Sequence, residues 1–257
     1  MDINYLGLAF ALLLLIFPIL IFLHLKLKLI GQLFTSFGRM IIQLSLMGIW
    51  LEFLFTQKIS WLTLFWMLIM ISNAVFTLRG RLKFQRRILL PILATALGST
   101  SIIIMPWILF MVIRPQPFFS PEYAIPIYGM VLGNSMNSLA LALERFESGL
   151  SDNWRAYYTR LGLGANLWEA ALPTFRKAMH ASLLPQLLNI ASMGVVSLPG
   201  MMTGQILGGS SPLVAIKYQM MIMTAIFSGV CLTDYLGIRF YLSKRFDKYN
   251  LPLKEYK

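Results

Sequence analysis

The sequence predicts an all-α integral membrane protein, a polytopic helical bundle of about seven transmembrane helices. Hydrophobic residues make up 58% of the 257 positions, charged residues make up 12%, and the mean hydropathy is +0.71. Soluble domains carry about 25% charged residues, so this chain has too few to cover a soluble surface. Apolar runs of membrane length also recur along the chain, with short polar segments between them. We therefore expect residues 1–257 to form a single transmembrane domain.

Each apolar run is a candidate span, because a helix needs about 20 mostly apolar residues to cross the hydrocarbon core. The candidates are Ile3–Leu25, Met40–Phe55, Trp61–Leu78, Ile88–Ile113, Ala124–Leu143, Leu183–Leu207 and Leu213–Leu242. The first run lacks the basic start and cleavage site of a signal peptide, so we expect it to be retained as a helix. The sixth is broken at Pro199 and Gly200, where the helix either ends or re-enters the membrane as a buried turn.

The basic residues predict the orientation of these spans. All but three of the 22 Lys and Arg residues fall on one side of the membrane, and the other side receives Lys58, Arg114 and Lys217. The positive-inside rule then places the N-terminus outside, the C-terminus inside and residues 144–180 in the cytoplasm. The net charge of +12 is read as a topology signal, and we expect no nucleic-acid partner.

Several classes of chemistry are excluded by missing motifs. The single cysteine, Cys231, excludes an intramolecular disulfide and a cysteine-rich metal site. The chain has no Walker A sequence for ATP and no nucleophile elbow. We expect no enzyme activity and no cofactor in this chain.

The polar segment 144–180 is the most distinctive part of the sequence. Ser151 is the expected N-cap of a helix that ends at Leu161, and a turn containing Gly162 and Gly164 follows. Asn166 is the expected cap of a second short helix, which Pro173 should bend. Its apolar surface would consist of Leu167, Trp168, Ala171, Leu172 and Phe175. An alternative is that the two helices lie as an amphipathic pair on the membrane surface.

This segment resembles the coupling loop of ABC transporter permeases. The resemblance lies in RLGLGANLWEAALPTFRKAM (160–179), which is followed by SLLPQL (182–187). In that family, the turn and its flanking helices insert into a groove of a separate ATPase subunit. The resemblance implies that the ATPase-coupling residues are Arg160, Gly162, Gly164, Ala165, Trp168 and Glu169.

Five further motifs resemble the FetB-type ABC transporter permeases, the membrane subunits of a bacterial iron exporter with plant relatives linked to aluminium tolerance. They are GRMIIQL (38–44), SNAVFTLRGR (72–81), IPIYGMVLGNSMN (125–137), GVVSLPGMMTGQILGG (194–209) and SPLVAIKYQMM (211–221). The resemblance implies a multi-pass permease of the cell membrane that works as a homodimer. It also implies two cytoplasmic ATPase subunits, which bind ATP and Mg, and export of a metal-linked substrate, with iron as the first expectation.

Polar residues at helical spacing predict the translocation path. Asn134, Asn137 and Ser138 share a face of the fifth span, and Asn189 and Met193 share one on the sixth. Exposed amides are costly in hydrocarbon, so these faces should line a protein interior or a water-filled route. The alternative is that they only hydrogen-bond neighbouring helices, at about 0.6 kcal/mol per bond.

The sequence shows no clear set of ligands for a hard metal ion, and the candidate ligands are scattered. Met201 and Met202 offer thioethers beside the helix break, which suit soft ions such as Cu(I), although packing is the simpler role. Asp234 would face the dimer cavity or pair with Arg239, and Glu52 and Glu122 would line an exit or simply lie at the interface.

Two other functions remain open at this stage. An ion-gradient-driven secondary transporter would need a charge pair within the membrane, for which Asp234 is the candidate acid and Arg79 or Arg239 the partner. A membrane scaffold without transport would make the polar faces incidental. Copurification with an ATPase separates the three.

Overall fold

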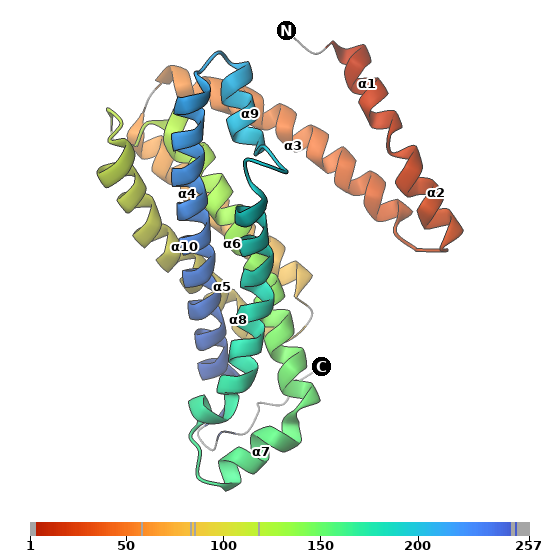
Figure 1. Cartoon of the computed structure of the whole chain (residues 1–257), viewed down its shortest axis with the longest axis vertical. Coiled ribbons are helices and arrows are strands. Elements are labelled where there is room, and N and C mark those ends of the chain that lie inside the picture. Colours follow the sequence, from red (N-terminus) through yellow and green to blue (C-terminus); the bar gives the residue numbers. More distant parts are fainter. Residues whose placement is uncertain are drawn as a thin grey trace. The chain divides into compact units, whose positions relative to one another are not determined.

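The structure is a computed structural model that describes residues 4–57, 59–82, 84, 86–117, 119–247 and 250 (Figure 1). Within these residues the named elements are all helices, and an isolated bridge joins Met193 to Ser197. The all-α class is therefore confirmed. The chain divides after Gln57 into two compact units, which are described separately.

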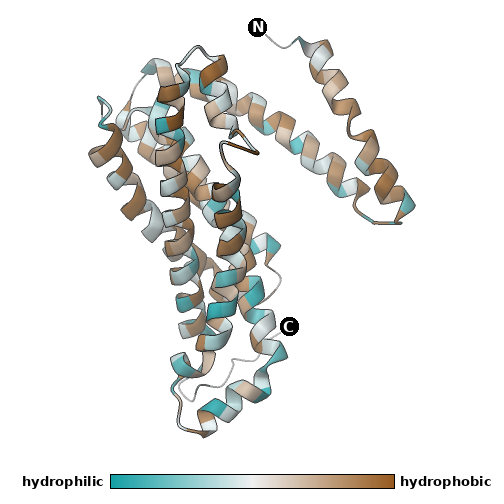
Figure 2. Ribbon diagram, viewed as in Figure 1, coloured by the Kyte–Doolittle hydropathy of each residue, from teal (hydrophilic) through white to brown (hydrophobic). Residues whose placement is uncertain are grey.

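The first unit contains α1 (Tyr5–Leu13), α2 (Ile16–His24) and α3 (Ile30–Gln57). The first predicted span is thus two helices with a turn between them, although Leu6–His24 together has the length and composition of a span. The second begins ten residues earlier than the predicted Met40. Figure 2 shows that these helices are mostly apolar, and most of their large apolar side chains are exposed. Such a surface suits contact with lipid rather than water.

The second unit holds the remaining helices and the main core. Its elements are α4 (Ser60–Arg81), α5 (Arg86–Pro106), the π-helix η1 (Trp107–Ile113), α6 (Pro121–Asp152), α7 (Trp154–Gly162), α8 (Leu167–Ser192), α9 (Gly200–Leu207) and α10 (Pro212–Arg245). Helices α6 and α10 form the centre: α10 packs against α5, α6, α8 and α9, while α4 and α8 pack against α6.

Small residues let α6 and α10 approach closely. A Cβ added to Gly237 on α10 would overlap Leu139 of α6, and one added to Gly229 would lie 2.9 Å from Cγ1 of Val131. Glycine at such contacts allows helix backbones to pack through many van der Waals contacts, which is a main source of association within a membrane.

Five helical segments of the described chain are long and apolar enough to cross a membrane. They are Leu6–His24, Ile30–Gln57, Ser60–Arg81, Ile88–Ile113 and Pro212–Arg245. The polytopic membrane class is confirmed. Helices α6 and α8 have 32 and 26 residues but are not among the five. The count of seven and the N-out, C-in orientation therefore stay predictions.

Two expectations around residues 151–192 are wrong. Ser151 lies within α6, and Asn153 occupies the N-cap position of α7. The second polar helix is not short, because it continues through Pro173 and joins the start of the predicted sixth span in one helix, α8. The predicted break in the sixth span is confirmed, since α8 ends at Ser192 and α9 begins at Gly200.

Candidate functional site

The turn between α7 and α8 is fixed by local hydrogen bonds. The backbone N–H of Glu169 donates to Asn166 Oδ1, and the backbone N–H of Asn166 donates to Glu169 Oε2, both at 2.9 Å. This reciprocal capping box satisfies two donors that a helix start otherwise leaves unpaired. Gly164 has φ +93°, a left-handed conformation that strains any other residue. The predicted cap at Asn166 and a turn at Gly164 are therefore confirmed, whereas Gly162 is the last residue of α7. We call α7, this turn and the first turns of α8 (residues 154–175) the tip.

The larger side chains of the tip are held by contacts within the tip and with α10. Arg160 Nη1 donates to the carbonyl oxygen of Ala170 at 3.0 Å. The guanidinium of Arg239 on α10 lies 5.1 Å from the centre of the Trp168 ring, and the Phe175 ring lies 4.9 Å from that of Trp168. Of the predicted apolar surface, Ala171 and Phe175 are buried in the core. The most exposed large apolar side chain of the tip is Leu163, whose exposed fraction is 83%. Sequence reasoning missed this residue, although its place between Gly162 and Gly164 was a signal.

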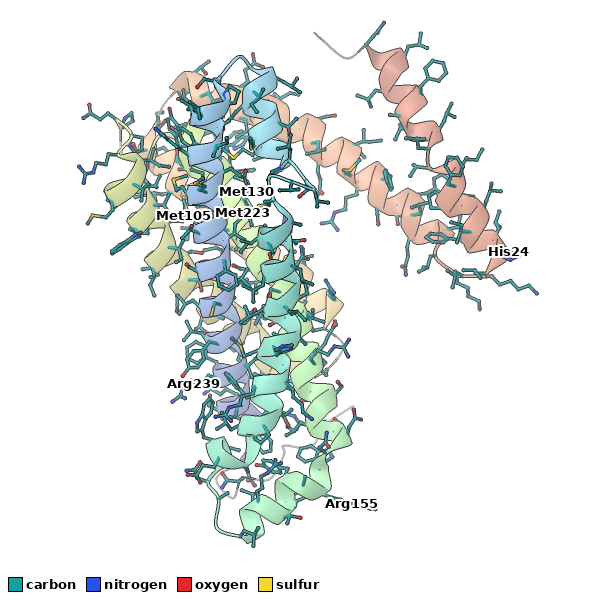
Figure 3. The ribbon with its side chains drawn as sticks, in the orientation of Figure 1. His24, Met105, Met130, Arg155, Met223 and Arg239 are labelled. Atoms are coloured by element: carbon teal, nitrogen blue, oxygen red, sulfur yellow. The ribbon has the colours of Figure 1, made fainter. Side chains whose placement is uncertain are left out.

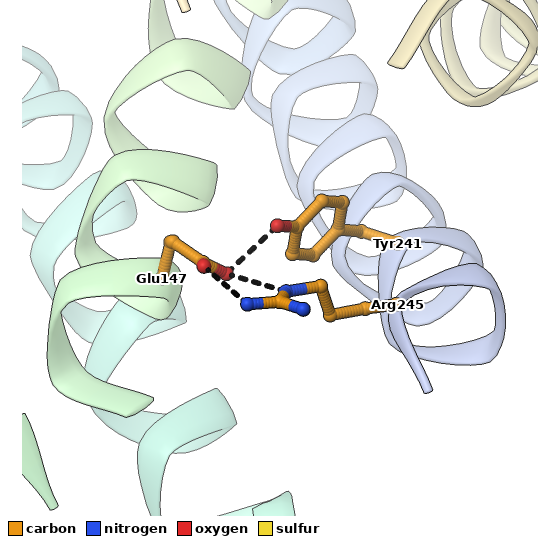
Figure 4. Close-up of polar contacts among 3 residues, drawn as sticks. All are labelled: Glu147, Tyr241 and Arg245. Carbon is orange, nitrogen blue, oxygen red and sulfur yellow. Dashed lines mark hydrogen bonds and ion pairs between the residues drawn. The ribbon is translucent and has the colours of Figure 1, made fainter. Parts of the chain in front are cut away.

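A second cluster joins α6 to α10 at the same end of the unit (Figure 4). The Tyr241 hydroxyl donates to Glu147 Oε2 at 2.7 Å, and Arg245 Nη2 lies 3.1 Å from Glu147 Oε1. Nearby, the Tyr157 hydroxyl donates to the carbonyl oxygen of Asn250 at 3.0 Å. Burial, together with Tyr158 and Asp247, raises the pKa of Tyr157 to about 12, so it remains a donor at neutral pH. The Glu147 cluster joins the two central helices, and the Tyr157 bond joins the tip to the segment that follows α10.

The predicted polar face of the fifth span is split. Asn134 Nδ2 donates to the carbonyl oxygen of Met130 one turn earlier in α6, at 2.8 Å. Asn137 is exposed, whereas Ser138 is buried. On α8, Asn189 is exposed. None of these four residues belongs to the lining of a cavity that lies at the end of α8.

A cavity of about 580 Å³ lies where α8 ends. The break is shaped by Gly194, whose φ is +85° and whose N–H donates to the carbonyl oxygen of Ser197 at 3.0 Å. The lining comes from the end of α8, the break, α9 and α10: Ile190, Met193, Gly194, Leu198, Pro199, Met202, Ile216, Gln219, Met220, Met223, Thr224, Phe227 and Ser228. The structure thus brings together three predicted residues, Met193, Pro199 and Met202. The sequence analysis missed the contribution of α10.

The chemistry of this lining is soft and uncharged. Four of the lining residues are methionines, and Gln219, Thr224 and Ser228 supply neutral polar groups. Gly200 starts α9 beside the cavity, while Met201 packs against the core instead of the lining. Figure 3 shows Met223 towards the α9 end of α10 and Arg239 towards its other end. The volume is within the range of small-molecule sites, about 300–1,000 Å³.

Asp234 lies between three helices, away from the cavity lining. It is fully buried, and the Ser138 hydroxyl of α6 donates to its Oδ2 at 2.6 Å. The same hydroxyl lies 3.4 Å from the backbone carbonyl oxygen of Ser182 on α8. Arg239, the expected partner, stacks on Trp168 instead. Among the residues that the structure describes, no cation pairs with Asp234.

The acidic candidates do not gather into a metal site. Glu52 is exposed on α3 of the first unit, and Glu122 is exposed in the first turn of α6. Within the described ranges, no group of three or more His, Cys, Asp or Glu residues is placed to hold a metal ion. Any metal held by the described residues would need other donors, such as thioethers or ligands of its own.

The fold and the comparisons define the class of protein, a multi-pass helical membrane transport permease. The chain belongs to the Uncharacterised protein family (UPF0014), whose model matches residues 5–246. It is 40% identical to UPF0014 membrane protein slr1647 of Synechocystis over 197 residues, which cover 77% of this chain and 76% of that protein.

Two further relatives carry names that bear on function. Protein ALUMINUM SENSITIVE 3 of Arabidopsis thaliana is 35% identical over 200 residues, covering 77% of this chain and 71% of the relative. The probable iron export permease protein FetB of Escherichia coli is 31% identical over 232 residues, covering 90% of this chain and 88% of the relative. No solved structure matches the chain. The relatives' names describe membrane proteins and a permease, not enzymes, in agreement with the sequence analysis.

Proposed function

We propose that this chain is the membrane-spanning subunit of an ABC exporter, which moves a metal-linked substrate out of the cytoplasm with a separate ATPase. The observation that carries the proposal is the continuity of α8. This single helix starts at the capped tip and ends at the cavity (Figure 1). Its 26 residues span about 39 Å, enough to link a surface event to a site within the bundle.

In this mechanism two copies of the chain pair with two ATPase subunits. ATP and Mg bind to the ATPases, which close on each other and push the tip through the exposed Leu163 and its neighbours. The movement of the tip is transmitted along α8 to Met193 and the break. The cavity then closes to one side of the membrane and opens to the other. Export of iron by the FetB relative, as its name states, and the aluminium sensitivity named for the plant relative support a metal-linked cargo.

The cavity favours one form of that cargo. Iron and aluminium ions prefer oxygen or imidazole ligands, whereas the lining offers thioethers and neutral polar groups. A bare multivalent ion would be poorly solvated there. We propose that the metal travels with organic ligands whose apolar parts contact the methionines, since methionine adapts its shape to irregular partners.

Copurification tests the proposal. The tagged chain, extracted from native membranes, should retain an ATPase subunit. Gly164→Trp should lose the ATPase, because the substitution strains a left-handed residue at the tip and adds bulk to its surface. Gly209→Trp is the matched control: that glycine has the same φ of +93° and equally open surroundings, but it lies between α9 and α10. A Gly164→Trp variant with normal ATPase binding and efflux would contradict the coupling role of the tip.

Two other functions give different results. A secondary transporter would move cargo in vesicles that contain a gradient but no ATPase. The intramembrane charge pair expected of such a transporter is not formed by Asp234 in the described chain. A scaffold would show neither efflux nor ATP dependence.

A further inference from the structure

Helix α8 meets both central helices at one buried polar point. Asp234 of α10, Ser138 of α6 and Ser182 of α8 have exposed fractions of 0%, 4% and 2%. The Ser138 hydroxyl donates its one hydrogen to Asp234 Oδ2 at 2.6 Å, and its oxygen lies 3.4 Å from the backbone carbonyl oxygen of Ser182. We call these three residues the Asp234 junction.

The junction lies between the tip and the cavity along α8. Ser182 is about 22 Å from Leu167 at the start of the helix and about 15 Å from its end at Ser192, from a rise of 1.5 Å per residue. Much of the surrounding contact between α6 and α10 is apolar, such as Leu139 against Gly237. Apolar surfaces can slide past one another with little directional preference, whereas a buried hydrogen bond specifies one register.

The nearby cations are engaged elsewhere. Arg239 stacks on Trp168, and Arg245 pairs with Glu147. The junction is therefore a hydrogen-bonded contact and not an ion pair. It should depend on an acceptor at position 234 rather than on negative charge.

We propose that Asp234 is a positioning residue that, through Ser138, fixes the middle of α8 to α6 and α10, so that movement of the tip reaches the cavity. The inference rests on the proposed function. Asp234 touches neither the ATPase nor the cargo in this mechanism. Without the junction, α8 would shift against α6, and the push at the tip would be lost before the break at Met193.

Three variants and one control test this role in the permease–ATPase complex. Asp234→Leu removes the acceptor, Ser138→Ala removes the donor, and Asp234→Asn keeps an acceptor without charge. Thr233→Val is the matched control. Its hydroxyl donates to Thr100 Oγ1 at 2.8 Å, so the variant breaks a buried bond of the adjacent residue, but one that joins α10 to α5.

The readout does not require the cargo to be known. A cysteine introduced at Ser228, an exposed lining position, reports access to the cavity through its rate of maleimide labelling, with Cys231→Ser as background. In the parent protein, ATP should change this rate several-fold. Asp234→Leu and Ser138→Ala should bind the ATPase and hydrolyse ATP but lose most of that change. Asp234→Asn and Thr233→Val should keep at least half of it.

The outcomes separate the two proposals. A full ATP-dependent change in folded Asp234→Leu or Ser138→Ala would overturn the inference. So would an Asp234→Asn variant as defective as Ser138→Ala, or an equal defect in Thr233→Val. Melting temperature and elution profile identify folded protein. If Asp234→Leu does not fold, the test is the comparison of the ATP-dependent labelling change in Ser138→Ala with that in Asp234→Asn. If the proposed function is wrong, the parent protein itself will retain no ATPase. The inference then fails together with the proposed function.

Discussion

Single polar residues join α6 to α10 at two levels of the second unit. One contact is Ser138 with Asp234, and the other is Glu147 with Tyr241 and Arg245. The partners lie 96 and 94 residues apart in the sequence for the Asp234 and Tyr241 bonds. Sequence reasoning recognised Ser138 and Asp234 as unusual in their spans, but it could not pair them. Helical spacing relates positions three or four apart and carries no information about which helices become neighbours.

Glu147→Gln should destabilise the protein. The carboxylate accepts hydrogen bonds from both Tyr241 and Arg245, and the Arg245 and Glu147 side chains are only 9% and 15% exposed. Bonds to charged groups contribute about 1.5–3 kcal/mol each, so we expect a loss of about 2 kcal/mol in the free energy of unfolding. Glu144→Gln is the control. Its pair with Arg81 at 3.7 Å is about half exposed, and such pairs contribute about 0–1 kcal/mol. Thermal unfolding in detergent measures both, and equal melting temperatures for the two variants would contradict the prediction.

At the scale of elements, α8 shows what local signals can and cannot reveal. Asn166 was the expected cap and does start the helix, because a cap depends on residues within one turn; its reciprocal bond with Glu169 was not predicted. The extent of the helix was missed. The prediction ended the polar segment at His180 and began the sixth span at Leu183, yet α8 continues through both to Ser192. Tertiary packing against α6 and α10 sustains the helix across that polar stretch.

The contact between α6 and α10 gives an element-scale prediction. Gly237→Ala should lower the free energy of unfolding by about 1–3 kcal/mol, since its Cβ would overlap Leu139 and force the helices apart. Gly98→Ala on α5 is the matched control. Nothing lies within 4 Å of its added Cβ, so higher helix propensity should make it neutral or stabilising by up to about 1 kcal/mol. Unfolding in detergent compares the two. A Gly237→Ala variant as stable as Gly98→Ala would show that the helices do not depend on this close approach.

At the scale of the whole molecule, the sequence was informative about class and family and less so about the site. Composition predicted the membrane protein, and motifs in chain order predicted a family that the comparisons confirm over residues 5–246. Only part of the cavity lining was predicted from the sequence. Helical spacing drew attention to Met193, and the break at Pro199 drew attention to Met202, but Gln219 and Met223 looked like ordinary residues of a buried span. Their role depends on the end of α8 lying beside α10, and no local pattern encodes that.

The orientation of the chain can be tested at α6. This helix of 32 residues joins the external loop to the tip in the predicted topology, yet its composition does not place it among the five candidate spans. The asymmetry of the basic residues requires it to cross, because residues on either side of it are assigned to opposite faces. Cysteines at Gln116 and Leu163, both exposed positions, should therefore label from opposite sides of the membrane.

The labelling uses sealed vesicles and a reagent that does not cross lipid, with Cys231→Ser as background. Gln116→Cys should react from outside the cell, whereas Leu163→Cys should react only after permeabilisation. Lys244→Cys, at the far end of α10, is the control and should behave like Leu163→Cys, because the predicted sixth and seventh spans return the chain to the same side. Reaction of Gln116→Cys and Leu163→Cys from one side would mean that α6 does not cross. The tip would then lack the cytoplasmic position that contact with an ATPase requires.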